Sequence, residues 1–372
     1  MPASRNLRAI YKELGLFLRT PLNRPIAIYM IVCLVSTFMG ALMGRVNLKT
    51  GFFFVLKYFE YMIVYFMVVN YLYDRKQIRH FVWALFFTCV IVSIIGIAHI
   101  PGEGRVSAPF EGEAGEPNTF GGYLVFMMAI AIGLFLTAHA WKPGLIYGGV
   151  SMIAFIPFLY TQSRASYLAF IPMLLVFVWL SEKRKAITLF LLFFACLLPL
   201  VAPQIVKERV AYTFTQRPYQ GQIKIGGLRL DTSTSERLVS WKGALKDAVY
   251  HPILGFGITG YSFVDAQYPR VLVETGIIGI VSFLFLMWAI FKHSRITLQG
   301  TTDFFHRGLS MGFLAGFIGL LVHAIGTNTF IIVRIMEPFW FVAGMIVMIP
   351  ALESEFPQNS SGAMDSVKAG SV

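Results

Sequence analysis

Apolar runs recur along nearly the whole chain, and they limit the possible fold more than any other feature of the sequence. A run of roughly 20 apolar residues crosses the hydrocarbon core of a membrane, about 30 Å thick, as one α-helix. Hydrophobic residues make up 56% of the chain and charged residues 13%, which excludes an ordinary soluble domain. The sequence therefore predicts an all-α membrane protein, a polytopic helical bundle of about 10 transmembrane helices. The expected spans are 25–44, 52–73, 79–98, 119–140, 144–160, 165–180, 186–204, 270–291, 307–327 and 330–350.

Basic residues are distributed unevenly among the connections between these spans. Cytoplasmic connections of membrane proteins are enriched in Lys and Arg, so the basic segment 1–24 is expected inside. Both termini then lie in the cytoplasm, and the long connection 205–269 lies outside. Because short loops account for most of the net charge of +12, no nucleic-acid partner is expected. The other basic stretches expected inside are 74–79, Lys142, 182–185, and Lys292 with Arg295.

We expect one transmembrane bundle over residues 25–350, which contains the long connection 205–269. It is preceded by the basic segment 1–24 and followed by a tail over 351–372. The tail is rich in small polar residues without an apolar period, so we expect it to be disordered. The long outer connection has an amphipathic helix predicted over 235–252, with Leu238, Trp241, Leu245 and Val249 at helical spacing.

Two pairs of opposite charges lie within the expected spans. Lys57 and Glu60 are three residues apart on one helix face, as are Arg334 and Glu337. Ionisable residues inside a membrane usually face a protein-lined cavity. Each pair could therefore line a substrate cavity, or it could neutralise its own charge and fix helix packing.

Four stretches, in this order, carry a family resemblance. They are R-V-S-A-P-F…E-P-N-T-F-G-G-Y-L (105–124), T-Q-S-R-A-S-Y-L (161–168), S-E-R-L-V-S-W-K-G-A-L…H-P-I-L-G-F-G (235–257) and D-A-Q-Y-P-R-V-L-V-E-T-G-I-I-G (265–279). Together they resemble the bacterial O-antigen ligase and polysaccharide polymerase family of multi-pass inner-membrane glycosyltransferases. The resemblance covers roughly residues 100–290. The remaining spans resemble the family only in being apolar enough to cross a membrane.

The resemblance implies a fold with one large periplasmic loop that contains amphipathic helices, and an active face in the periplasm. It implies an undecaprenyl-diphosphate-linked glycan as donor, a glycan or lipid-linked acceptor, membrane lipids as surroundings, and chain-length regulators or other assembly proteins as partners. It also implies that no cofactor and no metal are used. The residues agree, because the seven His are scattered and no metal-ligand spacing occurs.

The last of the four stretches departs from the family pattern. Ligases of the family have His-Asn there and many polymerases Asp-Asn, followed by x-Tyr-Leu, whereas this chain has Asp265, Ala266, Gln267, Tyr268 and Pro269. The Asp in place of His favours an O-antigen or exopolysaccharide polymerase. The alternatives are an O-antigen ligase that transfers polymer to a lipid A core and, from another class, a flippase of lipid-linked oligosaccharides.

Glycan transfer from a lipid diphosphate needs positive charge at the leaving group and a base for the acceptor hydroxyl. The planar guanidinium of arginine binds two phosphate oxygens at once, so Arg164 and Arg237 are the expected catalytic cations. Asp265 is the expected base, although it could equally be a turn residue before the next span. Further residues expected to bind the diphosphate or glycan are Arg270, Arg217, Arg334 and Tyr268, of which Tyr268 could instead belong to the interfacial aromatic belt.

Overall fold

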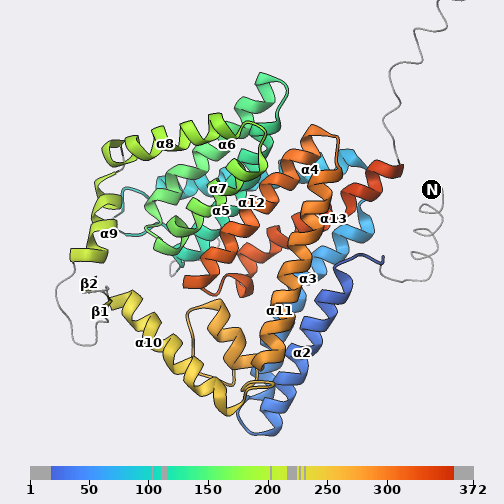
Figure 1. Ribbon diagram of the computed structural model, residues 1–372, viewed down its shortest axis with the longest axis vertical. Helices are drawn as coiled ribbons and strands as arrows, with labels where there is room; N and C mark the ends of the chain where they lie inside the picture. Colours follow the sequence, from blue (N-terminus) through green and yellow to red (C-terminus); the bar gives the residue numbers. More distant parts are fainter. Residues whose placement is uncertain are drawn as a thin grey trace, which may run out of the picture.

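The structure is a computed structural model of the 372-residue chain, and most of the residues it describes are helical (Figure 1). It describes residues 18–102, 104–109, 115–201, 203–215, 224–225, 228–229 and 232–355. The helices are α2 (Asn23–Leu42), α3 (Leu48–Tyr71), α4 (Arg75–Ala98), α5 (Pro117–Thr137), α6 (Trp141–Tyr160), α7 (Arg164–Leu180), α8 (Arg184–Val201), α9 (Gln204–Thr215), α10 (Thr232–Asp247), η2 (Ala248–Tyr250), α11 (Gln267–Gly300), α12 (Phe304–Gly326), η3 (Thr329–Ile331) and α13 (Val333–Glu355). Between α9 and α10, two-residue strands β1 (Lys224–Ile225) and β2 (Leu228–Arg229) pair antiparallel.

Helices occupy all ten predicted spans, which confirms an all-α, multi-pass membrane protein. Among the described residues, eight helices are long and apolar enough to cross a membrane: α2 to α6 and α11 to α13. The sixth predicted span is α7, which is apolar but has only 17 residues. The seventh is α8, a helix of 18 residues that is not among those eight.

The centre of the bundle is α12, which packs between α5 and α7, while α13 packs on α3 and α11 on α2 (Figure 1). Glycines let α5 and α12 approach closely, as small residues do in membrane bundles. A Cβ atom added at Gly133 of α5 would lie 2.4 Å from the Gly308 carbonyl oxygen and 2.6 Å from the Gly312 amide nitrogen of α12. This contact holds together the two most enclosed helices of the bundle.

The variant Gly133→Ala should therefore lower the midpoint of thermal unfolding of the protein in detergent. Gly149→Ala on α6 is the matched control, because no atom lies within 4 Å of its added Cβ. In a helix this exchange alone stabilises by roughly 0.5–1 kcal/mol, so the control should unfold at the same temperature or higher. Equal shifts for both variants would contradict the close α5–α12 contact.

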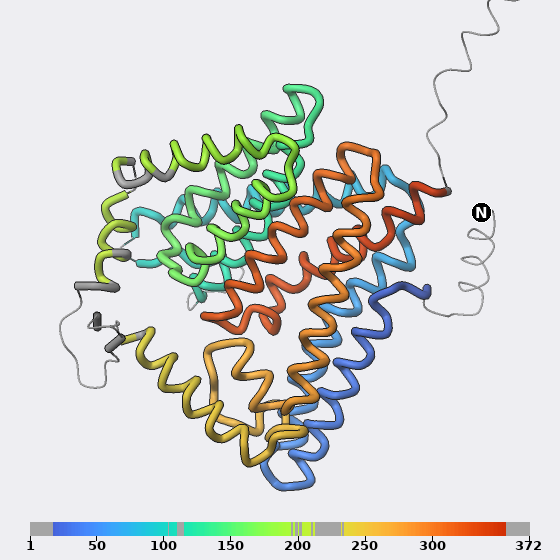
Figure 2. The backbone as a smooth tube through the Cα atoms, viewed as in Figure 1, coloured from blue at the N-terminus to red at the C-terminus, as the bar shows by residue number. Residues whose placement is uncertain are grey.

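The connections divide between two ends of the bundle (Figure 2). At one end Arg75, at the start of α4, donates hydrogen bonds to the carbonyls of Leu352 and Glu353 near the end of α13. At the same end Arg307 pairs with Glu182 at 2.6 Å. The other end, called the loop end below, contains the described residues of the α4–α5, α6–α7 and α12–α13 connections and of the region from α9 to the start of α11.

The start of α11 is joined to the loop before it by backbone hydrogen bonds. Gly276 has φ 67° and ψ −167°, so α11 is broken there into two helical segments. Phe256 and Gly257 donate to the carbonyls of Val273 and Glu274, before the break. Ile277 donates to the Pro252 carbonyl just after it, at 2.8 Å. A side chain at Gly276 would meet the Ile253 backbone, so this position requires glycine both for its φ and for space.

The amphipathic helix predicted at 235–252 is α10, but its predicted apolar stripe is partly wrong. The helix starts at Thr232 and changes to the 3₁₀ turn η2 after Asp247. Leu245 and Val249 are 51% and 73% exposed, because α10 packs through smaller side chains. Its buried contact with the loop end is made by Ala244, together with Trp241, against Val264, Ala266 and Val273.

Two boundaries also differ from prediction. The first is that of α11, which extends to Gly300, so Lys292 and Arg295 lie within a helix rather than in a loop. The Nζ atom of Lys292 lies 4.9 Å from the centroid of the Trp288 ring, and the Cζ atom of Arg295 lies 5.2 Å from that of the Trp179 ring. The second is that of α13, which continues to Glu355, so the first residues of the predicted tail are helical. Residues 356–372 lie outside the described residues.

Candidate functional site

Arg237 and Asp265, both predicted as catalytic, form an ion pair at the loop end. The Nε and Nη2 atoms of Arg237 donate to Oδ2 of Asp265 at 3.1 and 2.9 Å. Arg237 lies on the second turn of α10, and Asp265 is in the turn that precedes α11. Their side chains are 24% and 34% exposed, so the pair can be reached from outside. The small core around Trp241 and Ala244 fixes α10 against this turn and thereby positions the pair.

A buried imidazole lies close to this pair. His323, near the end of α12, is fully buried, and the charge of Arg237 acts on it. Its Nδ1 atom is 2.8 Å from the Thr329 hydroxyl and 3.0 Å from that of Thr327, and its Nε2 atom is 3.1 Å from the Ser166 hydroxyl. Both ring nitrogens therefore have partners that fix the orientation of the ring.

Hydroxyl and amide groups continue from His323 towards the α4–α5 connection. The Ser166 hydroxyl donates to the Ser163 hydroxyl at 2.7 Å, which donates to Oδ1 of Asn118 at 2.7 Å. Arg105 donates to the same Asn118 oxygen at 3.4 Å. Ser163 also caps the start of α7, since its hydroxyl accepts from the Ser166 amide. This polar network joins three connections of the loop end.

Three arginines gather around the short α6–α7 connection: Arg105, Arg164 and Arg209, called the arginine cluster below. Arg105 donates to the Thr161 carbonyl at 3.0 Å, and Arg209 to the Gln162 carbonyl at 3.4 Å. Burial lowers the pKa of Arg105, the charges of Arg209 and Arg164 lower it further, and only part of this is offset by Glu116. The three guanidinium groups therefore repel one another in a partly buried place. Such a site favours an anion.

Arg270, predicted to bind the diphosphate, lies instead in a buried ion pair. Its Nε atom donates to Glu274 at 3.2 Å, and the two side chains are 8% and 7% exposed. The Glu274 carboxylate also accepts from the Thr259 amide, and the Glu274 carbonyl accepts from Ser36 of α2. This placement favours a structural part for Arg270, which joins the loop to α2 and α11.

The variant Arg270→Met should lower the free energy of unfolding by about 3–5 kcal/mol, because it leaves the buried Glu274 without its partner. Adding Glu274→Gln should recover most of the loss, since the charge is then removed. The control is Arg307→Met, whose pair with Glu182 is 40% and 80% exposed and should contribute less than about 1 kcal/mol. Equal free energies of unfolding for Arg270→Met and Arg307→Met, measured by denaturation in detergent, would contradict a structural role for Arg270.

The remaining predicted residues are placed as follows. Tyr268 packs against Phe283 with its ring centroid at 6.3 Å and donates to the Leu321 carbonyl, which favours packing over sugar stacking. Arg334 lies on the wall of a cavity between α4 and α13, described below. Arg217 lies outside the described residues. Within the described residues, no group of three or more His, Cys, Asp or Glu side chains could hold a metal ion.

Residues 149–284 match the family model described as O-antigen ligase. The match covers less than half of the chain, and over this stretch the chain is similar to the O-antigen ligase family. No curated protein matches the chain. The O-antigen ligase segment runs from α6 into α11 and carries Arg164, Arg209, Arg237 and Asp265. The polar loop-end groups thus lie largely inside the matched segment.

Five residues of the site lie outside the O-antigen ligase segment, and sequence reasoning did not assign them a role: Arg105, Asn118, His323, Thr327 and Thr329. The signal for His323 was available in the sequence. It is a histidine in an otherwise apolar span, and a polar Thr-Asn-Thr run begins four residues later. A polar group at membrane depth normally has a partner or a function. The Arg105–Asn118 contact depends on how the loops meet, which spacing alone does not give.

Proposed function

We propose that the protein is a glycosyltransferase that joins lipid-diphosphate-linked oligosaccharides to a glycan acceptor on the periplasmic face of the bacterial inner membrane. The family match supports an O-antigen ligase or polymerase type of function in general. Asp265, where ligases of the family have His, favours the polymerase. The donor would be an undecaprenyl-diphosphate-linked repeat unit. Both termini would lie in the cytoplasm.

The observation that carries this proposal is the arginine cluster beside the Arg237–Asp265 pair. Arg105 and Arg209 donate to backbone carbonyls of the α6–α7 connection, and the charges of Arg209 and Arg164 repel that of Arg105. A diphosphate would relieve this repulsion, and arginine binds its oxygens in pairs. Since charge grows on the diphosphate as it leaves, the same groups would stabilise the transition state more than the bound donor.

In the proposed step the acceptor hydroxyl oxygen attacks the anomeric carbon of the donor sugar. A new carbon–oxygen bond forms while the bond from that carbon to the diphosphate oxygen breaks, and the diphosphate leaves with the electron pair. The hydroxyl proton passes to the Asp265 carboxylate. Arg237 would move from Asp265 to the diphosphate when the donor binds, which frees the carboxylate to act as the base.

His323 would be a positioning residue in this scheme. It is buried, has partners on both ring nitrogens, and carries the hydroxyl network that orders the α6–α7 connection next to the arginines. Its neighbour Arg237 is one of the two groups that the proposed chemistry needs.

The test is deletion of the gene, followed by analysis of the polyprenyl-linked glycans of the cells. A polymerase is supported if single repeat units accumulate on the outer side and polymer is lost. Long chains that remain on the lipid carrier would point to the ligase instead. Single units trapped on the cytoplasmic side would contradict both and indicate a flippase.

A further inference from the structure

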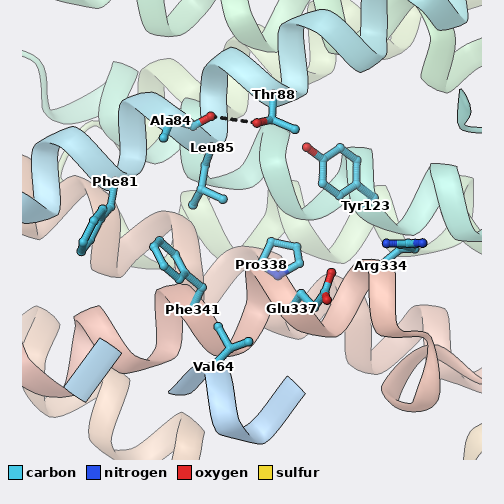
Figure 3. A pocket seen from close by; sticks show the side chains of 10 residues that line it. All are labelled: Val64, Phe81, Ala84, Leu85, Thr88, Tyr123, Arg334, Glu337, Pro338 and Phe341. Carbon is cyan, nitrogen blue, oxygen red and sulfur yellow. Dashed lines mark hydrogen bonds between the residues drawn. The ribbon is translucent and has the colours of Figure 1, made fainter. Parts of the chain in front are cut away.

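A groove lies between α4 and α13, and its lining does not include Arg164, Arg237 or Asp265 (Figure 3). Its cavity holds about 380 Å³, which is within the range of pockets that bind small ligands. The α4 wall is Phe81, Ala84, Leu85 and Thr88, and the α13 wall is Arg334, Glu337, Pro338 and Phe341. Val64 of α3 and Tyr123 of α5 complete the lining.

The two ends of the groove differ in polarity. Arg334, Glu337 and Tyr123 lie towards one end, and Phe81 and Phe341 towards the other (Figure 3). The rings of Phe81 and Phe341 meet edge to face with their centroids 5.2 Å apart, which closes the apolar end. At about 1.5 Å per residue, the seven steps from Arg334 to Phe341 give the groove a length of about 10 Å.

The sequence accounts for the space between the two helices. The α4 helix is held by α6, where Trp83 stacks on Tyr147 with ring centroids 5.7 Å apart, and it contacts α13 less. On the other wall, Pro338 has no amide hydrogen to donate to the Arg334 carbonyl four residues earlier. This missing hydrogen bond allows α13 to bend where it lines the groove.

The polar end of the groove adjoins the candidate site. A Cβ added at Gly122 of α5 would lie 2.8 Å from Ile335 and 3.0 Å from the His323 ring. Gly122 is next in sequence to Tyr123, and Ile335 to Arg334, and both of these residues line the groove. Sequence neighbours on α5 and α13 thus contact the His323 network and line the polar end of the groove.

The long side of the groove opens away from the protein core. Ala84 and Thr88 are exposed, and on the same helix Phe87 is 70% exposed. Because α4 is one of the helices long and apolar enough to cross a membrane, this side faces lipid. The groove can therefore be entered sideways from the bilayer, and it leads towards the loop end.

We infer that the α4–α13 groove holds the first isoprene units of the polyprenyl chain of a lipid-diphosphate substrate. The assignment rests on the proposed function, and it adds where the lipid of that substrate lies. An apolar chain fits the Phe81–Phe341 end, while the diphosphate remains near the cationic loop end. Arg334, on the polar rim, then lies where the chain joins its phosphate, and the adjacent carboxylate of Glu337 keeps the phosphates themselves out of the groove.

The test replaces Phe341 by p-benzoylphenylalanine, which keeps an aromatic ring at the closed end of the groove. The full chain is placed in phosphatidylglycerol nanodiscs, undecaprenyl diphosphate is added, and adducts formed by light are weighed by mass spectrometry. We expect an adduct with undecaprenyl diphosphate, reduced at least tenfold by Ala84→Trp, which fills the groove. Phe87→Trp, which points to lipid from the same helix, should leave the yield unchanged.

An adduct with phosphatidylglycerol alone would overturn the assignment, since the groove would then hold bulk lipid. No adduct, or equal yields from Ala84→Trp and Phe87→Trp, would overturn it as well. The proposed function is judged separately, because crosslinking needs no catalysis. Cells that form polymer without the adduct would refute the groove alone, and an adduct without any glycan transfer would refute the proposed function alone.

Discussion

Arg237→Ala should reduce polymer formation by about 100- to 1,000-fold, the usual effect of removing one group that stabilises charge in a transition state. The Arg237 guanidinium forms an ion pair with Asp265 at 2.9 Å, and its charge also acts on the His323 ring. Arg237→Lys should recover only part of the activity, because an ammonium group cannot bind two phosphate oxygens in one plane. The measurement is the length and amount of polymer on a silver-stained gel from cells in which the variant is the only copy.

Lys242→Ala is the matched control for this experiment. Lys242 is an exposed cation on the same helix and has no place in the proposed chemistry. Its removal should leave polymer unchanged, while both variants insert into the membrane in equal amounts. Normal polymer from Arg237→Ala, at normal protein level, would remove Arg237 from the mechanism.

The second large effect is expected for Asp265→Asn. Asparagine keeps the size of the side chain and an oxygen that accepts from Arg237, but it cannot take the proton of the acceptor hydroxyl. General bases contribute about 100- to 10,000-fold to a rate, so transfer by purified protein in nanodiscs should fall within that range. The KM for the lipid-linked donor should change little, since the donor is bound by the arginines.

The same variant decides between the two readings of Asp265. A turn residue needs only its oxygen, which asparagine also provides, so full activity of Asp265→Asn would reject the base and leave the turn. Asp247→Asn is the control, because Asp247 accepts a hydrogen bond from Tyr261 at 2.7 Å in the same loop region. It should leave transfer unchanged, since that contact lies outside the proposed chemistry.

The sequence predicted the fold well because membrane spans are set by length and hydropathy, which are local properties. The contact between Arg237 and Asp265, on different elements of the loop end, was also predictable in part. Arg237 and Asp265 were chosen for their chemistry and for their place in family-like stretches, and they lie in contact. The same grounds favour Arg270 as a site residue. It lies four residues before Glu274 on one helix, however, and because both side chains are buried there they form an ion pair with each other.

What the sequence could not supply was the set of contacts between distant elements. The predicted stripe of α10 has large apolar side chains facing inward, whereas Ala244 and Trp241 make the contact with Val264 and Ala266, and Leu245 is exposed. Arg334 and Glu337 lie on the wall of the α4–α13 groove, which could not be predicted because it depends on α4 packing more against α6 than against α13. Neither relation has a periodic signature along the chain.

The break of α11 at Gly276 is bridged rather than left open. Residues 252–257 form backbone hydrogen bonds with α11 on both sides of Gly276, so they connect the two segments of this helix. If the segment after Gly276 tilts, residues 252–257 must move with it, and so must the turn that carries Asp265. Because helices tilt to match the lipid around them, we expect the rate of the proposed transfer to depend on bilayer thickness.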